Sequence, residues 1–148
     1  MDHERWMREA LALADEAAEA GEVPVGCVVV RGETVVGRGR NRREEDRSAL
    51  AHAEILAIRE ACRTLGDWRL SDCGLYVTLE PCPMCAGAIL NARLRWVCYG
   101  ARDGKTGSCG SVLNLFEENY GYRPAIYGGI LEAECLERMQ AFFRGLRS

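Results

Sequence analysis

The chain has 148 residues, of which 48% are hydrophobic and 28% are charged, and its formal net charge is -3. This length suits one domain with its own core, and the composition is that of an ordinary globular protein without low-complexity segments. We therefore expect a single domain over residues 1–148. The slight negative charge argues against nonspecific coating of nucleic acid, which depends on neutralising phosphates, but leaves room for a local basic patch.

No stretch of the sequence has the length of a membrane span or the form of an export signal. The longest apolar run, residues 23–30, is far short of the roughly 20 residues that a bilayer requires. The N-terminal residues lead directly into a charged amphipathic pattern. We expect a cytoplasmic protein without membrane contact, whose cysteines stay reduced.

The first half of the chain predicts a helix, a hairpin and a second helix. Apolar residues at three- and four-residue steps predict an amphipathic helix over residues 3–20. Two β-branched runs, residues 23–30 and 34–39, are joined by a short segment with a glycine, which is typical of a hairpin. Residues 41–50 are polar and aperiodic, so we expect a loop. Helical periodicity returns over residues 55–65.

The second half predicts a strand over residues 74–79, a helix over 82–92 and a strand over 95–100, which together form a crossover. A glycine-rich loop covers residues 101–111. A helical turn at 112–116 and a short strand at 125–127 precede the last helix. The apolar face of that helix is expected to contain Leu131, Cys135, Met139, Phe142 and Leu146. Strands that alternate with crossover helices indicate a layered α/β domain with a mixed sheet.

Eight cysteines stand in the chain, and in a reducing compartment metal binding is a better use for them than disulfides. Only Cys82 and Cys85 have the spacing of metal ligands. Cys109 lies in the glycine-rich loop, and its role stays open. The other five lie in apolar or strand-like segments, where cysteine acts as a small hydrophobic residue: Cys27, Cys62, Cys73, Cys98 and Cys135.

One imidazole, from His52, and two thiols, from Cys82 and Cys85, form a ligand set that zinc prefers. A structural zinc site would need a fourth ligand, and the other histidine, His3, lies at the N-terminus, where we expect fraying. Three protein ligands leave one coordination position open, as in catalytic zinc sites. The sequence therefore predicts one catalytic Zn²⁺ per subunit.

The spacing places both parts of this site at the beginning of helices. Cys82 and Cys85 share one helix face, because residues three apart are neighbours. His52 and Glu54 are two apart and cannot face the same way within a helix, so we expect them where the chain turns into one. Helix N-termini favour thiolates and other anions. Zinc lowers the pKa of bound water to about 7, and Glu54 is then available to carry the proton.

These motifs resemble those of the cytidine and deoxycytidylate deaminase superfamily, and most closely those of the bacterial tRNA-specific adenosine deaminases. A histidine, one residue and a glutamate, followed by Pro-Cys-x-x-Cys, are the signature of zinc base deaminases. The resemblance covers nearly the whole chain. The segments that carry it are residues 22–26, 41–42, 51–55, 75–88, 100–103 and 105–107.

The resemblance implies a three-layer, cytidine-deaminase-like α/β fold, in which a five-stranded mixed sheet has helices on both faces. It implies hydrolytic deamination of adenosine to inosine at the wobble position of a tRNA anticodon, with Glu54 as proton carrier. Asn41 and Ala53 are expected to bind the target nucleoside, and Asp103 and Lys105 to contact anticodon nucleotides. A homodimer that binds one anticodon stem-loop per active site is also implied. Without the resemblance, Asn41 could equally be a residue that caps a loop. Asp103 and Lys105 could equally be solvated surface residues without a binding role.

The sequence departs from the family pattern at Tyr120-Gly121-Tyr122, where relatives usually show phenylalanine or methionine followed by Asn-His. The two tyrosines suit either stacking on unpaired bases or packing in the core. Basic residues that could meet phosphates are scattered, as on a solvated surface. They are Arg42, Arg43, Arg93, Arg95, Lys105, Arg138, Arg144 and Arg147.

Two alternatives stay open. A deaminase of a free base or nucleotide, of the guanine or cytosine type, would share the zinc site. The altered segment at residues 120–122 keeps this alternative open, whereas Asn41 and the loop at residues 103–111 favour RNA. A noncatalytic, zinc-stabilised RNA-binding protein would not need Glu54, whose presence argues against this class.

Overall fold

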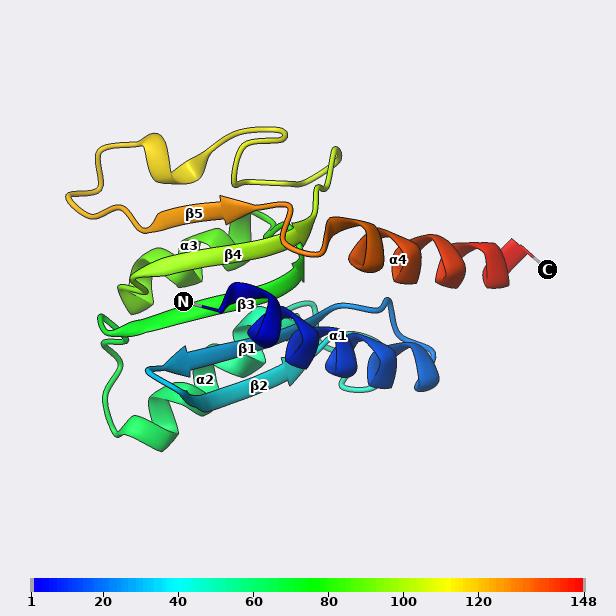
Figure 1. The fold of residues 1–148 in the computed structure, drawn as a ribbon, viewed down its shortest axis with the longest axis horizontal. Helices are drawn as coiled ribbons and strands as arrows, with labels where there is room; N and C mark the ends of the chain where they lie inside the picture. The colour runs from blue at the N-terminus through cyan, green and yellow to red at the C-terminus, as the bar shows by residue number, and fades with distance from the viewer. Residues whose placement is uncertain (1, 148) are drawn as a thin grey trace.

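A computed structural model describes residues 2–147, in which a five-stranded sheet lies between two layers of helices (Figure 1). The strands are β1 (Gly26–Arg31), β2 (Thr34–Arg40), β3 (Cys73–Leu79), β4 (Trp96–Ala101) and β5 (Ala125–Gly128). The helices are α1 (His3–Glu19), α2 (Ala53–Leu65), α3 (Pro83–Ala92) and α4 (Glu132–Arg147), with a 3₁₀ turn η1 (Leu115–Glu117). No helix within residues 2–147 is long and apolar enough to cross a bilayer.

The sheet is mixed, and its strand order is β2-β1-β3-β4-β5. Strand β1 pairs antiparallel with β2 and β3, whereas β3, β4 and β5 run parallel. The predicted hairpin is β1–β2, and Gly32 at φ +62° makes its turn. The predicted crossover is β3–α3–β4. The predicted α/β class with a mixed sheet is therefore confirmed.

Both faces of the sheet are buried, because successive strand residues point to opposite sides. In β1, Cys27 and Val29 belong to the core beneath α2 and α3, while Val28 and Val30 belong to the core beneath α1. Helix α4 contacts β4 and lies beside α1, on the same side of the sheet (Figure 1). This arrangement is the predicted three-layer fold, with helices on both faces.

Glycines allow two helices to lie directly on the strands. A Cβ atom at Gly26 of β1 would lie 2.0 Å from the carbonyl oxygen of Ala10 in α1. A Cβ atom at Gly39 of β2 would lie 2.3 Å from the carbonyl oxygen of Ala53, the first residue of α2. The close approach at Gly39 fixes the start of α2, and therefore the position of His52.

The first strand begins at Gly26, three residues later than predicted. Pro24 has no N–H to donate to a strand partner. The N–H of Val25 donates to the carbonyl of Val23 at 2.9 Å, so these residues form a local turn instead. The helical turn predicted at residues 112–116 is also displaced, to Leu115–Glu117.

Two further predictions about the chain ends are wrong. His3 is not frayed: it begins α1, and its Nδ1 lies 2.8 Å from the hydroxyl of Tyr76. On the predicted apolar face of the last helix, Cys135 is buried and Leu131 and Met139 pack against the core, so the prediction is wrong only at Leu146, which is 68% exposed. The C-terminal half of α4 projects beyond the sheet, where no core is available to cover it (Figure 1).

Candidate zinc centre and active site

The two halves of the predicted zinc site begin two neighbouring helices, as the spacing predicts. His52 is the N-cap of α2, and Cys82 is the N-cap of α3, where Pro83 takes the first helical position. Neither side chain forms the usual N-cap hydrogen bond, so the imidazole and the thiol are available as metal ligands. Cys85 follows in the first turn of α3, on the side that faces α2.

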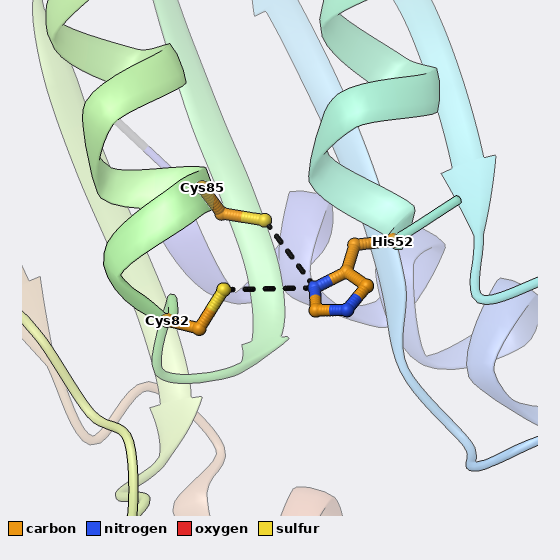
Figure 2. A group of neighbouring side chains, drawn as sticks. All are labelled: His52, Cys82 and Cys85. Atoms are coloured by element: carbon orange, nitrogen blue, oxygen red, sulfur yellow. Dashed lines mark hydrogen bonds between the residues drawn. The ribbon is translucent and has the colours of Figure 1, made fainter. Parts of the chain in front are cut away.

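His52, Cys82 and Cys85 converge on one point between α2 and α3 (Figure 2). The Nδ1 atom of His52 lies 3.6 Å from the Sγ atom of Cys82 and 3.5 Å from that of Cys85. The three candidate ligand atoms all lie within 4.8 Å of one another. A single metal ion can therefore reach all three.

The protonation chemistry of the three side chains also suits a metal. A hydrogen bond from Cys85, helped by His52, lowers the pKa of Cys82 to about 4 despite partial burial. The same hydrogen bond, together with burial, raises the pKa of Cys85. Hydrogen bonding to Cys82 raises the pKa of His52. The three side chains are thus linked by shared protons, which a divalent cation would displace on binding. Their nitrogen and sulfur atoms are ligands that zinc prefers.

Glu54 follows the ligand His52 by two positions, as the second residue of α2, and is only 4% exposed. Burial raises the pKa of its carboxyl to about 7. A carboxyl with such a pKa can both accept and release a proton near neutral pH. This property suits the predicted role of proton carrier.

A cavity of about 160 Å³ opens beside this group. Six predicted residues line it: Asn41, His52, Ala53, Glu54, Cys82 and Asp103. The other predicted ligand, Cys85, is fully buried behind them. Lys105 does not line the cavity; it is exposed and lies in a separate hollow beside Leu136 and Phe143 of α4.

Asn41 and Asp103 line the cavity, and both also hold the local backbone. The Oδ1 atom of Asn41 accepts the N–H of Arg43 at 3.0 Å, and its amide donates to the carbonyl of Val23 at 3.4 Å. The carboxylate of Asp103 accepts the N–H of Lys105 at 2.9 Å and the hydroxyl of Thr106 at 2.9 Å. Each of these two side chains thus stabilises the conformation of its own loop, and each also faces the cavity in which a substrate would bind.

The wall also contains Arg43, which the sequence predicted as a phosphate contact, and five residues that were not predicted: Val23, Val25, Leu79, Glu80 and Thr106. The prediction placed Val23 and Val25 inside a strand and therefore missed them. The local turn beside Pro24 instead leaves both at the end of the sheet, where they give the cavity an apolar wall. For Glu80 the signal was available, because an acidic residue directly before Pro81-Cys82 must lie next to the metal ligands.

The two tyrosines of the unusual segment have different surroundings. Tyr120 is 57% exposed, so its ring is free to meet a partner. Tyr122 packs against the core, with the guanidinium of Arg93 5.8 Å from its ring centre. Three of the scattered arginines form ion pairs: Arg42 with Asp46, Arg138 with Asp15 and, at 3.9 Å, Arg43 with Glu44.

The cysteines outside the site behave mainly as predicted. Four are buried: Cys27, Cys73, Cys98 and Cys135. Cys62 is partly buried and packs against the same core. Cys109, whose role the sequence left open, is 5% exposed, and burial raises the pKa of its thiol to about 12. Such a thiol is a packing residue and not a nucleophile.

Comparison with known proteins places this fold and site among the deaminases. The MafB19-like deaminase family matches residues 1–147. The tRNA-specific adenosine deaminase of Bacillus subtilis is 48% identical over 145 residues, which are 97% of this chain and 90% of that protein. The chain therefore belongs to the deaminase family, and it is a deaminase.

Solved structures of two kinds of deaminase resemble this chain. One, from a study of A-to-I editing by tRNA:A34 deaminases at the wobble position of transfer RNA, has a TM-score of 0.87 and 44% identity. It aligns with 90% of this chain and 98% of its own. The guanine deaminase of Bacillus subtilis has a TM-score of 0.67 and 34% identity, over 97% of this chain and 95% of its own. The predicted resemblance to the tRNA-specific adenosine deaminases is thus confirmed, and the guanine deaminase is more distant.

Proposed function

We propose that this chain hydrolyses adenosine to inosine at the wobble position of a tRNA anticodon. The observation that carries the proposal is the meeting of His52, Cys82 and Cys85 beside the buried Glu54, at the wall of one cavity. The likeness to a tRNA-specific adenosine deaminase over 97% of the chain supports adenosine in tRNA as the substrate.

His52, Cys82 and Cys85 would hold one zinc ion per subunit, through Nδ1 and the two Sγ atoms. Zinc bound there supplies a Lewis acid that lowers the pKa of water to about 7. The cavity opens beside these three residues, and His52 and Cys82 form part of its wall. The ligands come from helix N-termini, whose dipoles favour the thiolate forms.

Glu54 moves the protons of the reaction. Hydrolysis replaces the amino group at C6 of adenine with the oxygen of water and releases ammonia. Glu54 accepts a proton from the attacking water, delivers it to N1 of the ring, and passes the second water proton to the departing amine. Glu54 lines the cavity and is 4% exposed, so its carboxyl lies where the water and the base would meet.

The wall of the cavity is suited to one unstacked base. Val23, Val25 and Leu79 give it an apolar surface, and Asn41 and Asp103 add polar groups. A base reaches such a pocket only when it leaves its stack, as in an anticodon loop. Arg43 at the wall is placed to meet a phosphate, which a free base does not carry.

The remaining parts of the proposal concern assembly and location. We propose that the chain forms a single domain over residues 1–148 and binds RNA in the cytoplasm. We also propose a homodimer that binds one anticodon stem-loop per active site. Lys105 is proposed to contact RNA outside the cavity. Sedimentation velocity of the zinc-loaded protein tests the dimer, and a monomer at micromolar concentration would contradict it.

The substrate is tested by offering the zinc-loaded protein a tRNA with adenosine at the wobble position, an anticodon stem-loop, free adenosine, guanine and cytosine, each at equal concentration. Ammonia release and chromatography of the nucleosides measure conversion. We expect conversion of both RNAs and little of the small molecules. Conversion of guanine or cytosine in preference to RNA would support the rival small-molecule deaminase instead.

A further inference from the structure

Glu80 is a buried acid between strand β3 and the zinc ligands. Its N–H continues the sheet by donating to the carbonyl of Ala101 at 2.9 Å, and its side chain is 2% exposed. The next two residues are Pro81 and Cys82. A carboxylate at such a position needs several donors, because an unsatisfied buried charge is very costly.

The donors come from one loop, residues 103–111. The Oε1 atom of Glu80 accepts the N–H of Asp103 at 3.0 Å and the hydroxyl of Ser111. The Oε2 atom accepts the N–H of Cys109 at 3.0 Å and the N–H of Ser111 at 3.1 Å. All four donors are neutral, so the carboxylate holds both ends of the loop without forming an ion pair with it.

The loop also lies directly on this carboxylate. A Cβ atom at Gly107 would lie 2.5 Å from Oε1 of Glu80, so only glycine allows the approach. The N–H of Ser108 donates to the carbonyl of Pro81 at 2.9 Å. The loop is therefore attached to the residues that deliver Cys82 to the zinc site.

The same loop forms one wall of the cavity, through Asp103 and Thr106. We propose that Glu80 is a positioning residue, which holds this wall at a fixed distance from the zinc ligands so that the target base lies against Glu54. Glu80 acts through the backbone of the loop and not on the substrate. The inference rests on the proposed function for the identity of the substrate, but the geometry that it concerns is independent of that identity.

The variant Glu80→Gln tests this role. The amide keeps the size of the side chain but replaces one acceptor oxygen with a donor, which faces main-chain N–H groups. A matched control is Glu60→Gln, because Glu60 also accepts a main-chain N–H, that of Arg38 at 3.1 Å, on an exposed part of β2 and α2. Bound zinc, hydrogen exchange of the loop amides, and kcat and KM on a wobble-adenosine tRNA are measured for both variants and the wild type.

For Glu80→Gln we expect unchanged zinc content, faster exchange confined to the amides of residues 103–111, and a loss of about tenfold or more in kcat/KM. Glu60→Gln should match the wild type in all three. Should Glu80→Gln fail to fold, Ser111→Ala removes one of the four donors and is expected to shift the same readouts less. Wild-type exchange in the loop, together with wild-type kcat and KM, would overturn the proposal. If the wild type itself does not convert tRNA, the proposed function fails, and the exchange data still decide the role of Glu80.

Discussion

The Nδ1 atom of His52 lies 3.5 Å from the Sγ atom of Cys85, although 33 positions separate the two residues in the chain. Each belongs to the first turn of its own helix or to its cap, and the two helices lie side by side on one face of the sheet (Figures 1 and 2). Strand β3 brings the chain back between them. The zinc site is therefore a product of the crossover connection and depends on the packing of both helices.

The ligand set predicts that Cys82→Ser and Cys85→Ser lose zinc. Serine is a poor ligand for zinc beside a thiolate and an imidazole, so the metal content should fall from about one per chain to a small fraction of that. Metal analysis after exhaustive dialysis measures the ratio. Cys62→Ser is the control, because Cys62 lies outside the site and its Sγ lies near the carbonyl of Trp68. Full zinc in the Cys82 or Cys85 variant would show that the ligand set is wrong.

Removal of the proton carrier should stop turnover without removing the metal. Glu54→Ala is expected to lower the rate of deamination by about 10²-fold to 10⁴-fold, the usual contribution of a general acid–base group. The zinc content should stay at the wild-type value, since Glu54 is not a ligand. Single-turnover assays with metal analysis of the same sample measure both. A Glu54→Ala protein with full activity would remove this residue from the mechanism.

Asp103 should matter more for RNA deamination than for folding. Asp103→Ala removes the acceptor for the N–H of Lys105 and for the hydroxyl of Thr106, so the cavity wall is expected to loosen. We expect a loss of about tenfold in kcat/KM and a change of less than about 1 kcal/mol in the free energy of unfolding.

Asp103→Asn separates the two roles of this carboxylate, since the amide oxygen can still accept the N–H of Lys105 while the amide nitrogen can donate to the hydroxyl of Thr106. If Asp103→Asn has near-normal activity and Asp103→Ala has low activity, the loss of activity is due to the changed shape of the loop. Loss in both variants would assign it to the charge. Wild-type rates on tRNA in both variants would show that Asp103 is only part of the scaffold.

The contact of β2 with α2 predicts that Gly39→Ala disturbs the zinc site through packing. The added Cβ atom would meet the carbonyl oxygen of Ala53 at 2.3 Å and would push away the start of α2, next to His52. We expect a destabilisation of about 1–3 kcal/mol, typical of overpacking, together with weaker zinc binding. Gly37→Ala, which would meet Ala57 at 2.2 Å one turn further along α2, is the matched variant. Urea denaturation and zinc titration should show similar stability losses, but a larger loss of zinc affinity for Gly39→Ala; equal zinc affinities would contradict the coupling.

Glu80 should make stability depend on pH under acidic conditions. Burial opposes ionisation, but the hydroxyl of Ser111 and the N–H groups of the loop outweigh it and lower the pKa of Glu80. The ionised carboxylate therefore stabilises the folded state fully above the unfolded-chain pKa of about 4.3, and this stabilisation is lost as pH falls through the lower, folded-state pKa. The difference in unfolding free energy between the wild type and Glu80→Gln should thus shrink below about pH 4. A difference that stays constant down to pH 2 would contradict this assignment.

Much of the fold could be predicted because the signals are local. The glycine at position 32, the periodicity of α2 and the crossover around α3 each depend on neighbours in the chain. The start of β1 could not be predicted from β-branched residues alone. Pro24 has no N–H to donate to a neighbouring strand, so the strand begins only after it. The exposure of Leu146 also escaped prediction, because the apolar pattern of α4 does not reveal where the sheet ends.

The metal ligands could be predicted for a similar reason: residue type and spacing at two helix starts define them. Asn41, Ala53 and Asp103 were expected only from the family resemblance. The remaining wall could not be predicted, because it comes from segments that meet only in the folded chain. Val23 and Val25 reach the cavity from the N-terminal side, and Thr106 reaches it from the loop after β4. Lys105 and Thr106 are adjacent in sequence, yet only Thr106 lines the cavity, a difference that depends on the turn held by Asp103.

The most direct test of the central claim is to incubate zinc-loaded wild type and Glu54→Ala with a tRNA that carries adenosine at the wobble position, and to detect inosine as guanosine after reverse transcription. We expect conversion at that one position with the wild type, and none above background with Glu54→Ala at equal zinc content. Conversion at other adenosines, equal conversion by the variant, or no conversion by the folded, zinc-replete wild type would contradict the assignment.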